Sequence, residues 1–124
     1  MSDPSLDKLG EFLIRRVRDK AIGDWEKVVA GEMRGTSAIR VRQQLTAFGP
    51  QQADLFLKLL PQIVDTTLHH LLWALEQERS LDLLAKDEQG IGHNVRDASD
   101  GLSGELYGHQ GWIARFSSKP KHDV

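Results

Sequence analysis

The sequence predicts an all-α protein, folded as a single compact bundle of four to six helices with an irregular, glycine-rich C-terminal segment. Apolar residues recur at three- and four-residue steps along most of the chain, which places them on one face of a helix. The alternation typical of a strand is confined to residues 39–42, inside a helical pattern. A chain of 124 residues can bury a core without disulfide bonds, so we expect one domain over residues 1–118 and a frayed tail at 119–124.

The first predicted helix carries apolar residues at helical spacing from Leu6 to Val17. Acidic residues precede basic ones along it, which suits the helix dipole. Gly23-Asp24 predicts a pause, and Gly31 predicts the end of a second helical patch. A third stripe follows at residues 39–48 and closes at a Gly-Pro pair.

The densest helical pattern lies between Pro50 and Arg79. Pro61 lacks a backbone N–H and disfavours helical geometry at the residue before it, so we expect a kink or break near Leu60. The helix that follows is expected at the centre of the core. Its apolar stripe consists of Ile63, Val64, Leu68, Leu71, Leu72 and Leu75.

The helical pattern weakens after residue 79. Residues 86–94 are polar and predict a loop. Residues 95–106 fit one helical face despite two glycines, each of which costs about 1 kcal/mol relative to alanine. A short last helix is expected at residues 112–116.

Composition excludes several classes of protein. The chain has no cysteine, which excludes disulfide bonds, thiolate chemistry and sulfur-ligated zinc. No apolar run approaches the roughly 20 residues that cross a bilayer, and the first residues form no signal-peptide core, so we expect a cytoplasmic protein without a membrane partner.

The net charge is −2. Residues 1–62 carry ten basic and eight acidic residues and residues 63–124 carry six and ten, a skew too mild to predict nucleic-acid binding.

Three polar residues of the central helix, Asp65, His69 and Glu76, share one sector beside the apolar stripe because they lie at offsets of four and seven. Carboxylates and imidazoles that converge in a helix bundle can bind a metal ion. Polar residues that flank a buried stripe give the same pattern, and no HExxH or paired ExxH motif supports a metal site. We therefore expect no cofactor, and a metal-dependent or acid–base enzyme is the alternative. Its further ligands would come from His93, Asp97, Asp100 and Glu105.

Trp73 does not fit the apolar stripe, because on a helical wheel it lies about 140° from Leu68. The favoured explanation is that the C-terminal segment packs over the indole ring. The other is that the ring belongs to a partner-binding surface, where tryptophan is common. That surface would comprise Trp73, Tyr107 and Trp112.

A basic patch is a further candidate, for phosphate or for an acidic partner. Interleaved acidic residues favour an ordinary solvated face with local ion pairs instead. The patch would consist of Arg15, Arg16, Arg18, Lys20, Arg40 and Arg42.

The strings LHHLLWALEQE at 68–78 and SDGLSGELYGHQGWIARFS at 99–117 resemble small bacterial helical proteins of unknown function, some of which look like immunity or accessory proteins. The resemblance covers about the C-terminal half and implies a compact bacterial all-α domain, with no functional residue carried over. Since catalytic motifs are also missing, we expect a non-enzymatic protein–protein interaction domain. It would act as an immunity-type inhibitor or an adaptor whose acidic C-terminal half meets a basic partner, in an oligomeric state that the sequence leaves open.

Overall fold

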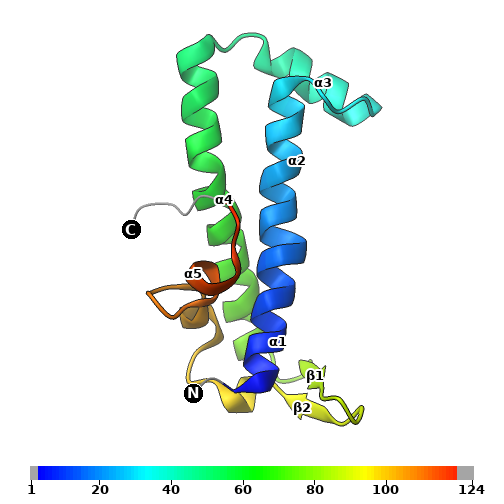
Figure 1. The fold of residues 1–124 in the computed structure, drawn as a ribbon, viewed down its shortest axis with the longest axis vertical. Helices are drawn as coiled ribbons and strands as arrows, with labels where there is room; N and C mark the ends of the chain where they lie inside the picture. Colours follow the sequence, from blue (N-terminus) through cyan, green and yellow to red (C-terminus); the bar gives the residue numbers. More distant parts are fainter. Residues whose placement is uncertain (1–2, 120–124) are drawn as a thin grey trace.

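A computed structural model describes residues 3–119, and two long antiparallel helical rods dominate it (Figure 1). The first rod joins α1 (Pro4–Leu13), the π-helical turn η1 (Ile14–Arg18) and α2 (Asp19–Ala30). The second rod is α4 (Pro50–Gln77), and α3 (Thr36–Leu45) packs against α2 where the first rod ends. We call the end with α3 distal and the opposite end proximal. The protein is mostly helical, as predicted.

The chain after α4 returns along the proximal half of the rods (Figure 1). It contains β1 (Leu84–Lys86), β2 (Gly92–Asn94), the 3-10 turns η2 (Arg96–Ala98) and η3 (Leu102–Leu106), and α5 (Trp112–Phe116).

The two strands form a small antiparallel sheet, which corrects the prediction of an all-α fold with a loop at 86–94. The turn between them is built from local polar contacts. The Asp87 carboxylate accepts hydrogen bonds from the N–H groups of Gln89 and Ile91, both at 2.9 Å. Gly90 supplies the positive φ of 81° that the turn needs. Strands of three residues are too short to produce a recognisable alternation.

Side chains fix where the helices begin and end. The Asp3 carboxylate caps α1 by accepting from the N–H of Ser5 at 2.8 Å. Gly31, with φ of 79°, ends α2 in the left-handed conformation. Arg96 ends α4, because its buried guanidinium donates to the carbonyls of Leu75 and Glu78 at 3.1 and 2.7 Å.

Neither predicted interruption ends a helix. Gly23-Asp24 lies inside α2, so no pause is observed there, and Pro61 lies inside α4, so the helix does not break near Leu60. Pro61 and Leu60 are both buried, so packing of these side chains offsets the hydrogen bond that the proline ring removes.

The core occupies the proximal half, between the two rods and the C-terminal segment. Leu68 and Leu72 of the predicted stripe are buried in it, but Ile63 and Leu71 are 53% and 45% exposed. Ile63 lies about 140° from Leu68 around the helix, as far as Trp73 does, so the predicted stripe was too wide for one face. The buried core residues are Leu6, Leu13, Ile14, Leu68, Leu72, Val95, Leu102, Leu106, Trp112 and Ile113.

The distal half contains no comparable core. Residues 23–59 are all described, and none of them is buried as the core residues are. This half contains an aromatic cluster in which Trp25 and Phe48 each make an edge-on contact with Phe56, with ring centroids 5.6 and 6.3 Å apart. This half is a pair of helices with α3 at its end, and in this respect the predicted compact bundle is not observed.

Candidate protein interface

A buried ion-pair network joins the rods. In η1 the N–H of Asp19 bonds to the carbonyl of Ile14, five residues earlier, and this wider turn brings both Arg18 and Asp19 to the interior. The fully buried Arg18 guanidinium donates to both carboxylate oxygens of Asp65, at 2.6 and 3.3 Å. It also donates to Asp19 at 3.0 Å and to the Ser117 hydroxyl at 2.8 Å. Arg18 therefore does not belong to the solvated basic face that the sequence suggested.

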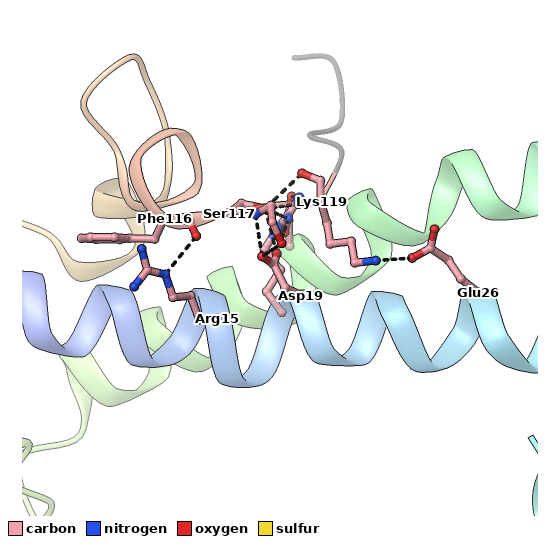
Figure 2. Close-up of polar contacts among 9 residues, drawn as sticks. Arg15, Asp19, Glu26, Phe116, Ser117 and Lys119 are labelled. Atoms are coloured by element: carbon pink, nitrogen blue, oxygen red, sulfur yellow. Dashed lines mark hydrogen bonds and ion pairs between the residues drawn. The ribbon is translucent and has the colours of Figure 1, made fainter.

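The same network anchors the end of the C-terminal segment on the first rod (Figure 2). The Asp19 carboxylate accepts from the Ser117 hydroxyl and from the Ser118 N–H, both at 2.8 Å. Lys119 forms an ion pair with Glu26 at 2.9 Å. Lys119 is thus an ordered contact and not part of a frayed tail, whereas residues 120–124 lie outside the described residues.

The three residues predicted as an alternative metal site each contact a different element. Asp65 pairs with Arg18, His69 Nδ1 lies 3.1 Å from the Tyr107 hydroxyl, and Glu76 accepts from the N–H of Leu102 at 3.3 Å. These contacts connect α4 to the first rod and to the C-terminal segment.

The further ligand candidates do not join the three residues of α4. His93 pairs with Asp87 at 2.8 Å, and Asp97 and Asp100 are exposed. Within residues 3–119, no three His, Cys, Asp or Glu side chains are grouped so that they could hold a metal ion.

Trp112 is buried in the core, so it cannot belong to the exposed partner-binding surface considered as the alternative. Its ring packs on Gly10 of α1, where an added Cβ would lie 2.5 Å from three ring atoms. Tyr107 is half-buried, and burial, followed by the charge of Asp65, raises the pKa of its hydroxyl above the usual value.

Trp73 is 55% exposed, and the predicted cover by the C-terminal segment is wrong. That segment packs on the face of α4 that carries Leu68 and Leu72. Trp73 follows Leu72 directly, so its side chain points about 100° away from the covered face.

Trp73 instead ends a row of exposed residues that runs along α4. We call this row the α4 seam: Leu59, Ile63, Thr66, His70 and Trp73. The steps between them alternate between four and three residues, the spacing by which helices pair in coiled coils. The row spans two heptads, or about 21 Å of helix. Its three large apolar members, Leu59, Ile63 and Trp73, are 43%, 53% and 55% exposed.

The solvent-facing side of this stretch carries no Asp, Glu, Lys or Arg. Between Lys58 and Glu76 the one charged residue is Asp65, and it is fully buried. Charged residues make up 27% of the chain, so a charge-free surface of four helical turns departs from its ordinary exterior. Depletion of charge combined with exposed aromatic and aliphatic residues is the composition found at the centre of protein interfaces.

A surface depression of about 500 Å³ lies at the proximal end, with acidic residues in its wall. Asp7 pairs there with Arg115 at 2.7 Å. Burial, followed by the charge of Asp100, raises the pKa of Glu105 above its usual value. The depression is therefore partly neutralised and differs in character from the α4 seam.

Comparison of the chain with protein-family models, with curated proteins and with solved structures found no match. Among the described helices, none is long and apolar enough to cross a membrane. Sequence reasoning singled out Trp73 but missed the other four residues of the seam. The alternating spacing from Leu59 to Trp73 and the charge-free stretch between Lys58 and Glu76 were the signals that could have identified it.

Proposed function

We propose that this protein is a non-enzymatic interaction domain that binds a helical polypeptide along the α4 seam. The observation that carries the proposal is a row of exposed residues at coiled-coil spacing, on a helix face without charge. Full burial of a large apolar side chain stabilises a complex by roughly 1.5 to 3 kcal/mol. Leu59, Ile63 and Trp73 offer apolar surface for such burial, and tryptophan is frequent among residues that dominate binding energy.

A protein partner fits this face better than a lipid surface does. Helices that lie on membranes carry lysine and arginine on their polar side to meet anionic lipids. Nothing comparable flanks the seam along α4, because no lysine or arginine occurs between Lys58 and Arg79. An adaptor and an immunity-type inhibitor, in a bacterial cytoplasm, would both use such a surface. The contacts of Asp65, His69 and Glu76 give the enzymatic alternative no comparable support.

Site-specific photo-cross-linking in the producing cells tests the proposal. A benzophenone amino acid at position 73 is expected to form a covalent adduct with a polypeptide on irradiation. The matched control carries the same group at Lys20 of α2, whose side chain is 71% exposed, and should form none. Ile63→Glu, added to the first variant, should abolish the adduct by placing a charge within the seam. Absence of an adduct at position 73, or equal adducts at both positions, contradicts the proposal.

A further inference from the structure

We infer that the polypeptide on the α4 seam is a second copy of this chain, whose α4 lies antiparallel to the first about a two-fold axis at Thr66. This inference rests on the proposed function and identifies its partner.

The surface area of the chain leaves enough exposed surface for a partner of domain size. The accessible surface is 8639 Å². A monomeric protein of 13.9 kDa exposes about 6,700 Å² by the usual scaling of surface with mass. Residues 1–2 and 120–124 contribute at most about 1,100 Å² to the excess, the area of an extended chain of their mass. The remaining excess of roughly 800 Å² reflects the two extended rods, and it is of the order that each partner contributes to an interface of standard size.

The absence of charge on the seam favours an identical partner over a different one. In a two-fold interface each residue near the axis meets itself or a close neighbour in the second copy. A charged residue there would face its own charge, which is destabilising, whereas an unlike partner is usually selected by opposite charges. The outward side of α4 between Lys58 and Glu76 carries neither positive nor negative residues, so two copies can meet on it without electrostatic repulsion.

The order of residues along the seam favours the antiparallel arrangement. Leu59 and Trp73 are each seven residues from Thr66, so an axis at Thr66 places Trp73 of one copy against Leu59 of the other. Ile63 of one copy then lies opposite position 69 of the other, one residue before His70. Parallel helices would instead set the two imidazoles and the two indole rings against each other, and would align the two helix dipoles unfavourably. The antiparallel arrangement also lays the well-packed proximal half of each copy beside the distal half of the other.

The first test is the mass of the purified protein by light scattering during size-exclusion chromatography. A dimer of two 13.9 kDa chains is expected. Ile63→Glu should raise the dissociation constant of the dimer on the order of 100-fold or more, because the interface loses two isoleucines and gains two carboxylates. Ile91→Glu is the matched control, since Ile91 is 59% exposed in the β-hairpin turn, and it should leave the dimer intact. An unchanged circular dichroism spectrum of Ile63→Glu shows that the exposed substitution leaves the fold intact.

The second test uses the absence of native cysteine for clean thiol cross-linking. Thr66→Cys alone should yield a covalent dimer with a short thiol-reactive reagent. Leu59→Cys and Trp73→Cys should each yield none, but a chain that carries both substitutions should yield one. Covalent dimers from all three single variants would overturn the antiparallel arrangement. A monomeric mass with no cross-link at Thr66 would overturn the second copy as partner. In that case the cross-link at position 73 in cells separates the two proposals. An adduct whose mass differs from that of a dimer supports the interaction along the α4 seam with a different partner. The absence of any adduct contradicts both the interaction and the second copy.

Discussion

Neighbouring residues of α4 occupy opposite environments, and this difference sets what each substitution does. Leu72 is fully buried, whereas Leu71 is 45% exposed outside the seam. Leu72→Ala should lower the free energy of unfolding by about 2 to 5 kcal/mol, the sum of lost transfer energy and a cavity. Leu71→Ala should cost less than about 1 kcal/mol, since half of its side chain already meets solvent. Urea denaturation of both variants measures the difference, and equal losses would contradict the assigned helix face.

The Arg18–Asp65 pair gives a second prediction at this scale. Asp65→Asn leaves the Arg18 guanidinium buried with half of its neutralising charge gone, which should cost about 3 to 5 kcal/mol of unfolding free energy. Glu11→Gln is the control, because it breaks the exposed Arg15–Glu11 pair and should cost less than about 1 kcal/mol. Thermal unfolding of both variants provides the comparison. Similar losses would mean that the buried pair adds nothing beyond a surface contact.

Glu105 should make the stability of the protein depend on pH in a defined direction. Burial and the charge of Asp100 raise the pKa of Glu105 in the folded protein above its ordinary value of 4.5. Its protonated form therefore favours folding, a contribution that is complete below pH 4.5 and lost as the pH rises through the folded pKa. Glu105→Gln, neutral at every pH, should raise the melting temperature at pH 7 and leave it nearly unchanged below pH 4. A gain of equal size at both pH values would contradict this origin.

For single residues, the sequence could not show which side chains contact each other in the folded protein. Arg18 and Asp65 are 47 positions apart, and their pairing depends on the wider turn of η1, which has no signature in the sequence. Arg18 was therefore grouped with the surface cations around it. Trp73 was a more tractable case, because its angle on the helical wheel already separated it from Leu68.

At the scale of whole elements, the two glycines inside the first rod differ in the space available for a larger side chain. Gly10→Ala would place a Cβ 2.5 Å from the Trp112 ring and should lower the unfolding free energy by about 1 to 3 kcal/mol through overpacking. Gly23→Ala would meet nothing nearer than Lys119 at 3.7 Å. It should raise the unfolding free energy by about 0.5 to 1 kcal/mol, as expected for alanine in a helix. Both values follow from denaturation curves, and a stabilised Gly10→Ala would show that Trp112 does not pack on α1 as described.

Helices were predictable from periodicity, but their continuity was not. Gly23 and Pro61 are local signals of a break, but the helix continues through both, and at Pro61 burial of the side chain outweighs the local preference. The β-hairpin was missed for the opposite reason. Its three-residue strands carry too little pattern, and its turn depends on the specific contacts of Asp87.

At the scale of the whole molecule, burial is distributed unevenly between two halves of comparable length. The C-terminal segment packs on the proximal half and completes a core there. It does not extend to residues 23–59, where the rods meet only each other and α3. This asymmetry was not accessible from the sequence, because the apolar patterns of the two halves are similarly dense.

Hydrogen exchange should report this asymmetry directly. Amides are protected in proportion to the free energy of the opening that exposes them, so a helix without a buried face exchanges faster. In the Ile63→Glu variant, the proximal amides around Ile14 and Leu72 should remain protected. The distal amides of α2 and of the first turns of α4 should exchange markedly faster than these proximal amides do. Mass spectrometry of peptides from both halves measures the contrast. Uniform protection in this variant would mean that the two halves unfold as one unit, which would contradict the uneven distribution of burial.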